Sequence, residues 1–233
     1  MCTLSYRLTE SGYELFFNRD EQRSRAQAIV PQVDNELNAI YPVDPIGQGT
    51  WLGVHQSGLG LALLNYYQAE KKAKSGEFIS RGEIILKLLA SQGDVIDNLK
   101  KLALNNYQPF QLCIFPEDLN LANNQIQLLQ WDGENLTQQP QSPFYTSSGV
   151  DYPQVYQARK RVFEQIISTS EPTTEQLLQF HQQQQQEGKL SVKMYREDAQ
   201  TVSFSHIVVN DNIQFNYVDY LDATQSLSSL KRI

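Results

Sequence analysis

Two strand patterns open this sequence: Cys2-Thr3-Leu4-Ser5-Tyr6-Arg7-Leu8 and Tyr13-Glu14-Leu15-Phe16-Phe17. The first alternates small or apolar side chains with polar ones, as a half-buried strand does. The second is rich in the aromatic residues that strands favour. The turn signal Ser11-Gly12 lies between them and predicts a β-hairpin. This hairpin leads directly into the polar motif Asn18-Arg19-Asp20-Glu21.

The length of the hairpin loop decides which residue of the motif lies opposite Cys2. A two-residue Ser11-Gly12 loop pairs Cys2 with Glu21, a three-residue loop pairs it with Asp20, and a four-residue loop pairs it with Arg19. Directly opposed residues have Cβ atoms roughly 4.5–5.5 Å apart, and diagonal neighbours about 7–8 Å. In every register we therefore expect Cys2 to lie beside Arg19 and Asp20.

Cys2 becomes the first residue of the chain once Met1 is removed, and the small size of cysteine makes that removal expected. The same residue then carries a thiol, with an unperturbed pKa of about 8.5, and a free α-amine, with one of about 7.7–8.0. The amine can act as the base for its own nucleophile, Arg19 favours the thiolate, and Asp20 can hold the α-ammonium. The alternative is that Cys2 is an ordinary small apolar residue in a buried strand.

Further along, the chain contains Gly49-Thr50-Trp51-Leu52-Gly53 and then Asn65-Tyr66. In this order behind Met1-Cys2 and the Asn18–Glu21 motif, these blocks resemble the NRDE family, also called the transport and Golgi organisation 2 family. The resemblance implies an N-terminal-nucleophile hydrolase of the α+β class, folded as a four-layer αββα sandwich of two mainly antiparallel sheets. Its mechanistic relatives, bile-salt hydrolases and cysteine-type penicillin acylases, cleave linear amides outside ordinary peptide bonds.

The resemblance also implies roles for single residues. Cys2 corresponds to the nucleophile, Arg19 and Asp20 to the charged pair beside it, and Asn65 to the side-chain amide of an oxyanion hole. A Ser57-Gly58 hairpin loop would set Asn65 opposite Thr50, and an Asn late in a strand is disfavoured unless it has a polar task. A structural Asn65 bonded to a neighbouring loop is the alternative.

The chain departs from the pattern of its relatives at two places. An Asn that lines the site in bile-salt-hydrolase-like proteins is absent from Tyr145-Thr146-Ser147-Ser148-Gly149, and a Thr-Arg-Thr of some members reads Thr201-Val202-Ser203. Arg196 could replace the missing arginine. The residues that we predict to bind the ligand are Asn18, Trp51, Tyr66 and Arg196. The aromatic side chains near the motifs form either an acyl pocket or ordinary core: Tyr6, Phe17, Trp51, Tyr66 and Tyr67.

The composition suits a compact protein. With 233 residues, of which 40% are hydrophobic, residues 1–233 can form a single domain. The net charge of −7 argues against nucleic acid or an anionic membrane as the main partner, and no apolar run approaches the ~20 residues of a membrane span. The chain has only two cysteines and no signal-peptide pattern, which predicts that the protein is located in the reducing cytoplasm. We predict no metal site and no cofactor, and the oligomeric state stays open.

The remaining patterns predict alternating helices and strands. Helices are expected over 80–90, 94–104, 151–168 and 173–185, and strands over 51–55, 60–66, 110–115, 125–131, 192–195, 201–209 and 212–218. Residues 116–124 and 138–143 read as loops, and Cys113 reads as inert packing. His181 and the glutamines that follow it read as the solvated face of a helix, and His55 and His206 as structural histidines.

The sequence thus predicts a cysteine-type hydrolase that acts on a small-molecule linear amide or thioester through an acyl-enzyme. One alternative is a catalytically lapsed family member that binds a hydrophobic ligand, an acyl lipid or haem, in trafficking. Another is a structural protein that only retains the fold. The missing Asn and Arg favour these alternatives, whereas Cys2, Arg19, Asp20 and Asn65 favour the enzyme.

Overall fold

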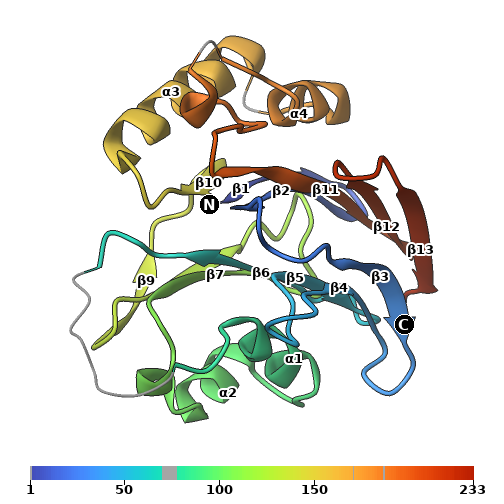
Figure 1. Ribbon diagram of the computed structural model, residues 1–233. Coiled ribbons are helices and arrows are strands. Elements are labelled where there is room, and N and C mark those ends of the chain that lie inside the picture. The colour runs from blue at the N-terminus through green and yellow to red at the C-terminus, as the bar shows by residue number, and fades with distance from the viewer. Residues whose placement is uncertain (1, 70–77, 170, 186) are drawn as a thin grey trace.

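Two antiparallel sheets packed face to face form the centre of the molecule, and helices cover both outer faces (Figure 1). The computed structural model describes residues 2–69, 78–169, 171–185 and 187–233. The first sheet has six strands, in the order β10 (Phe144–Ser147), β1 (Cys2–Thr9), β2 (Gly12–Gln22), β11 (Ala199–Val209), β12 (Asn212–Asp219) and β13 (Gln225–Lys231). The second has seven, in the order β3 (Ile29–Asp34), β4 (Ala39–Val43), β5 (Leu52–His55), β6 (Gly60–Asn65), β7 (Phe110–Phe115), β8 (Gln127–Trp131) and β9 (Leu136–Gln139).

The helices complete the four layers. The helices α1 (Gly82–Leu89) and α2 (Val95–Lys101) cover the seven-stranded sheet, followed by the 3-10 turn η1 (Leu104–Asn106). The helices α3 (Tyr152–Ile166) and α4 (Thr174–His181) cover the six-stranded sheet, followed by the 3-10 turn η2 (Gly188–Leu190). The expected αββα sandwich is therefore confirmed. None of the helices in the described ranges combines the length and apolar character that crossing a membrane requires.

Side-chain alternation along the central strand β2 builds two of the three core layers. Leu15 and Phe17 pack between the sheets, whereas Phe16 packs against α3 and α4. Because β2 lies between β1 and β11, nearly all of its residues are buried. The motif that begins at Asn18 thus lies on the most enclosed strand of the sheet.

The first hairpin has a different turn from the one expected. Cys2 pairs with Arg19 and Thr9 with Gly12, so the two-residue turn is Glu10-Ser11. Gly12 is the first residue of β2, and a side chain has no room there, since a Cβ would lie 1.9 Å from the carbonyl oxygen of Val209. The Ser11-Gly12 loop, which would have paired Cys2 with Glu21, therefore does not form. The third register, in which Cys2 lies opposite Arg19, is the one that forms, although it is reached without a four-residue loop.

The second hairpin is also shifted by one residue. Leu52 pairs with Ala62, and the backbone N–H of His55 donates to Leu59 across a three-residue loop. Gly58 in this loop has a φ of +95°, a left-handed conformation that glycine adopts readily. Asn65 pairs with Phe110 of β7. The predicted position of Asn65 opposite Thr50 was wrong.

Most of the other predicted elements form within a few residues of their expected bounds. Residues 192–195 are an exception, since they form no strand and Tyr195 makes only an isolated bridge to Gln200. The sequence patterns missed β3, β4, β9, β10 and β13. Of these, β13 has mostly exposed or half-buried residues, which explains its weak signal, and β10 has only four residues.

His181 does not lie on a solvated face. It ends α4, is completely buried, and its Nε2 lies 2.8 Å from the hydroxyl of Ser5. Burial, with a contribution from the positive charge of Arg159, lowers the pKa of His181 to about 3. The imidazole is therefore neutral in the folded protein at neutral pH.

The buried His181 predicts a loss of stability in mild acid. In the unfolded chain His181 binds a proton below about pH 6.5, its ordinary pKa. In the folded chain it binds one only near pH 3. The free energy of unfolding should therefore fall as the pH decreases through this window, by up to about 1.4 kcal/mol per pH unit. Urea unfolding of wild type and His181→Gln between pH 7 and pH 4 measures this slope.

In His181→Gln this part of the slope should disappear, even if the variant is less stable at every pH. The matched control is His55→Gln, since the side chain of His55 is only partly buried and should contribute less to the slope. An unchanged slope in His181→Gln would contradict the prediction.

Candidate active site

A cavity of about 500 Å³ lies where β1 begins, where β2 and β6 end, and where α1 begins. Cys2 lines it from the beginning of β1, and Arg19 from the end of β2. Asn65 lines it from the end of β6, and Arg81 from the N-cap of α1. The other residues that line the cavity and enter the argument below are Asp20, Glu21, Arg25, Asp44, Gly49, Trp51, Tyr67 and Gly82.

Cys2 is half-buried and packs against the core between the sheets. Its backbone N–H donates to the hydroxyl of Ser147 (3.0 Å) on the neighbouring strand β10. Burial raises the pKa of the Cys2 thiol, and the nearby Asp20 carboxylate adds to this shift, whereas Arg19 opposes it. Burial thus outweighs the opposing effect of Arg19 on the pKa of this thiol. Met1 lies outside the described residues.

Arg19 is held by a network inside the cavity. Its Nη2 lies 2.6 Å from Asp44 Oδ2 and 3.4 Å from Glu21 Oε2. Its guanidinium also stacks over Trp51, with 4.1 Å from Cζ to the ring centroid. Arg25 approaches the same Asp44 oxygen at 2.9 Å. Asp44 is thus the shared counter-charge of two arginines.

Asp20 faces the opposite side of the sheet, as strand alternation requires of a neighbour of Arg19. Its Oδ1 accepts a hydrogen bond from the hydroxyl of Thr201 (2.6 Å), and its Oδ2 lies 3.5 Å from Arg159 Nη2. Both side chains of this ion pair are fully buried. Burial raises the pKa of Asp20, and Arg159 opposes this shift.

Arg159 is a residue of the site region that the sequence patterns missed. It extends from α3 beneath β1 and β10, where it donates to the hydroxyls of Thr3 and Thr146 (2.7 Å to the latter). One side chain thereby connects the strand that begins with Cys2 to its neighbour and to Asp20. A signal was present, since Arg159 lies on the apolar face of its helix, between Val155 and Val162.

Although its strand register differs from the predicted one, Asn65 lines the same cavity as Cys2, and its amide already makes one hydrogen bond. Its Nδ2 donates to the hydroxyl of Tyr67 (2.7 Å), and both residues line the cavity that contains Cys2. Trp51 lines the same cavity. The predicted catalytic residues therefore meet at one place, while their roles stay predictions.

Three of the predicted binding residues lie elsewhere. Asn18 is buried and its Nδ2 donates to the backbone carbonyls of His181 and Val192 (2.9 Å each), so it fixes the segment after α4 to the sheet. Tyr66 lines a separate cavity of about 350 Å³. Arg196 pairs with Asp198 outside the Cys2 cavity and does not replace the missing arginine there.

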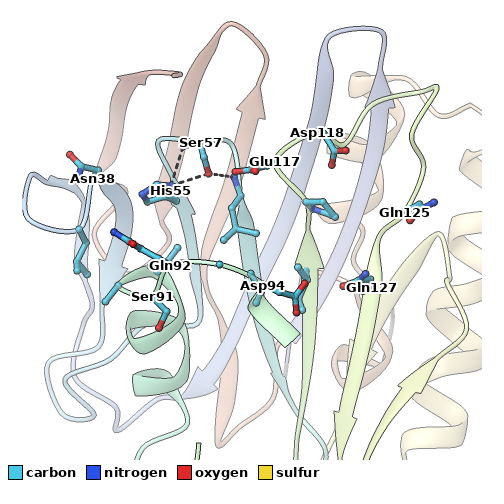
Figure 2. A pocket seen from close by; sticks show the side chains of 18 of the residues that line it. Asn38, His55, Ser57, Ser91, Gln92, Asp94, Glu117, Asp118, Gln125 and Gln127 are labelled. Atoms are coloured by element: carbon cyan, nitrogen blue, oxygen red, sulfur yellow. Dashed lines mark hydrogen bonds between the residues drawn. The ribbon is translucent and has the colours of Figure 1, made fainter. Parts of the chain in front are cut away.

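A further cavity, of about 910 Å³, lies around the β5–β6 hairpin and the start of α2 (Figure 2). It contains a serine and a histidine in contact, with 2.9 Å between Ser57 Oγ and His55 Nδ1. The same nitrogen also accepts the backbone N–H of Ser57 (3.1 Å). This pair therefore closes the hairpin turn, and the geometry favours a structural role over that of a nucleophile and base.

Four layers with two antiparallel central sheets are the architecture that this chain shares with N-terminal-nucleophile hydrolases. The chain belongs to the transport and Golgi organisation 2 family, whose model matches residues 1–226. The resemblance noted in the sequence is thus confirmed. No curated protein matches the sequence.

The solved structures that share this fold include those of two hydrolases. A mutant of the conjugated bile acid hydrolase from Clostridium perfringens superposes with a TM-score of 0.55 at 11% identity, covering 99% of this chain and 92% of that one. The Caenorhabditis elegans orthologue of N-acylethanolamine-hydrolyzing acid amidase superposes with a TM-score of 0.53 at 12% identity, covering 88% and 92%. At these identities the comparisons establish the fold.

The buried ion pair predicts a large stability loss in Arg159→Met. Methionine fills much of the same space but leaves the carboxylate of Asp20 without its cation, which typically costs about 3–5 kcal/mol. Without Arg159 the folded-state pKa of Asp20 rises further above its unfolded value. The loss should therefore grow as the pH is raised from about 4 to 7, and urea unfolding at several pH values measures it.

Arg161→Met is the matched control, because Arg161 is exposed on the same helix. It should change the free energy of unfolding by less than about 0.5 kcal/mol. Equal, small losses in both variants would show that the Asp20–Arg159 contact does not stabilise the fold.

Proposed function

We propose that this protein is a cysteine-type N-terminal-nucleophile hydrolase that cleaves a carbon–nitrogen bond in a small linear amide, with a thioester as an alternative substrate. The observation that carries the proposal is the position of Cys2. As the first residue of β1, it presents its thiol and its backbone nitrogen beside one cavity that Arg19 and Asn65 also line. The two amidases of the same fold support this class of reaction.

The proposed reaction begins with removal of Met1, which turns the backbone nitrogen of Cys2 into an α-amine. The amine takes the proton of the thiol, and the sulfur attacks the amide carbonyl carbon to give a tetrahedral oxyanion. The carbon–nitrogen bond then breaks, and the leaving amine takes the proton back from the α-ammonium. Water, activated by the same amine, releases the acyl group as an acid and restores Cys2.

The neighbours of Cys2 support this use of the amine. The hydroxyl of Ser147 already contacts the Cys2 nitrogen (3.0 Å), so it would orient the α-amine after processing. The carboxylate of Asp20, fixed by Arg159 and Thr201, would stabilise the positive charge that the amine acquires. Since burial raises the pKa of the thiol, the reaction depends on this local base.

The oxyanion would be held by Asn65. Its side-chain amide lines the cavity and is oriented by Tyr67 (2.7 Å). A donor that is fixed before the reaction stabilises developing charge without reorganisation, and one such donor contributes roughly 2.7–4 kcal/mol. Trp51 would form part of the substrate wall.

We further infer that residues 1–233 act as one domain in the cytoplasm, using only side chains of the protein and water. The alternative is a lapsed enzyme that binds a hydrophobic ligand. The cavity around Tyr66 favours it, since that cavity is lined largely by aromatic and amide side chains: Tyr66, Gln68, Gln111, Gln130, Phe144, Tyr145, Tyr152 and Tyr156.

Chemical modification of Cys2 tests the proposal. In protein from which Met1 has been removed, iodoacetamide should modify Cys2 and spare Cys113, which is fully buried and whose pKa burial raises strongly. Cys2→Ala should abolish turnover of a panel of amides and thioesters, and Cys2→Ser should leave at most a trace. Retention of Met1 should also abolish turnover, because it removes the amine.

Ser57→Ala is the control, since the Ser57–His55 pair of the second cavity should make no contribution to turnover. The hydrolase proposal fails if processed protein shows neither modification of Cys2 nor turnover. Tight binding of an acyl chain or of haem by the same sample would then favour the lapsed enzyme.

Replacement of Asn65 tests the oxyanion site. Asn65→Ala should lower the turnover rate by roughly 10²–10³ with little change in structure, because the donor acts only on the transition state. Steady-state kinetics and circular dichroism measure the two effects, and the exposed Asn105 provides Asn105→Ala as the control. A wild-type rate in Asn65→Ala would reduce Asn65 to a structural residue.

A further inference from the structure

Three arginines line the cavity around Cys2, and they differ in their partners. Arg19 and Arg25 share the carboxylate of Asp44, at 2.6 Å and 2.9 Å. Arg81 forms no ion pair with any carboxylate of the described part of the chain. It is therefore the cation of this cavity that has no assigned counter-charge among those residues.

The backbone holds Arg81 at the wall of the cavity. Its Nη1 donates to the carbonyl of Pro109 (3.0 Å), and Arg81 is the N-cap residue of α1. The following Gly82 packs directly on Gly49, where an added Cβ would lie 2.4 Å from the Gly82 carbonyl carbon. The carbonyl of Gly82 also accepts the backbone N–H of Thr50 (3.2 Å). The start of α1 is thus locked against the Thr50 segment that borders the cavity.

The three carboxylates that line the cavity form ion pairs with arginines other than Arg81. Asp20 pairs with Arg159 from behind the sheet, and Asp44 with two arginines. Glu21 lies near enough to raise the pKa of Arg81, but its carboxylate pairs with Arg19 at 3.4 Å. Burial lowers the pKa of Arg81 overall, although a guanidinium stays protonated at neutral pH. Among the described residues, the cavity and Arg159 behind it thus combine four guanidinium groups with three carboxylates, in a protein whose net charge is −7.

We propose that Arg81 binds a carboxylate on the substrate, so that the amides hydrolysed at Cys2 are those that carry an anionic group close to the scissile bond. A guanidinium offers a planar pair of donors that matches a carboxylate, and such charge-assisted pairs are among the stronger hydrogen bonds. This inference rests on the proposed function for its reaction, but the anion site itself can be tested without turnover.

A second possible role for Arg81 is stabilisation of the Cys2 thiolate, because the two groups lie close enough for Cys2 to raise the pKa of Arg81. The two roles differ in their dependence on the charge of the reagent. A thiolate-stabilising Arg81 would speed the attack of Cys2 on every electrophile. A carboxylate-binding Arg81 would speed the attack only on an electrophile that carries a carboxylate.

Iodoacetate and iodoacetamide separate these roles, since they deliver the same alkyl carbon with and without a carboxylate. In full-length protein lacking Met1, the iodoacetate-to-iodoacetamide rate ratio at Cys2 should exceed that of free cysteine by at least about tenfold, a modest gain for a cationic cleft. Arg81→Gln should remove this preference while the iodoacetamide rate stays within about twofold. Arg81→Lys should keep part of it, because the charge remains but the planar fork is lost.

Arg161→Gln is the matched control, because it removes the same charge from the exposed face of α3. It should leave the ratio unchanged. Equal slowing of both reagents in Arg81→Gln, or a ratio no higher than that of free cysteine, would overturn the proposal.

A binding measurement separates failure of this proposal from failure of the hydrolase. N-acetylglycine should raise the melting temperature of wild type more than N-acetylglycinamide does, as expected for a ligand that binds the folded state, and Arg81→Gln should lose the difference. This result would support the anion site even if Cys2 proved unreactive. Turnover of neutral amides with no melting difference would retain the hydrolase and overturn the anion site.

Discussion

The buried contact between Arg159 and Asp20 is the constraint on which the arrangement of the site depends. A guanidinium without solvent must find acceptors, and Arg159 finds them on three adjacent strands, at Thr3, Asp20 and Thr146. These strands are β1, β2 and β10, the same ones that place Cys2 between Arg19 and Ser147. Satisfying one buried charge thereby aligns α3 with the strands that support the nucleophile.

Strand alternation then divides the polar motif between two environments. Arg19 points into the space between the sheets, where it meets Trp51 and Asp44, whereas Asp20 points toward the helices. The cavity consequently holds arginines on one side of the sheet, while the acid that could support an α-ammonium is anchored from the other side. Among the described residues, Arg81 is then the arginine of the cavity with no carboxylate partner, which is the basis for the anion site proposed above.

The proposed amide hydrolysis depends on an earlier covalent step, the removal of Met1. Burial raises the pKa of Cys2, so the thiol needs a base within reach, and the cleaved N-terminus would provide one on the same residue. The family model and the solved structures establish the family and the fold, and the reaction itself remains the proposal made above. Processing of Met1 would then act as the step that activates the protein.

The sequence by itself determined the family, the αββα class, the first hairpin, and the meeting of Cys2, Arg19 and Asn65. These features follow from local alternation and from short motifs in order. Only the tertiary structure decided the register of the first hairpin. Gly12 lies against the backbone of Val209, a residue distant in the sequence, and this contact places Gly12 in the strand and not in the turn. It also decided that Asn18, Tyr66 and Arg196 leave the cavity, that His181 is buried, and that Arg159 and Arg81 reach the site region. Each of these depends on packing between segments distant in sequence, which no local pattern records.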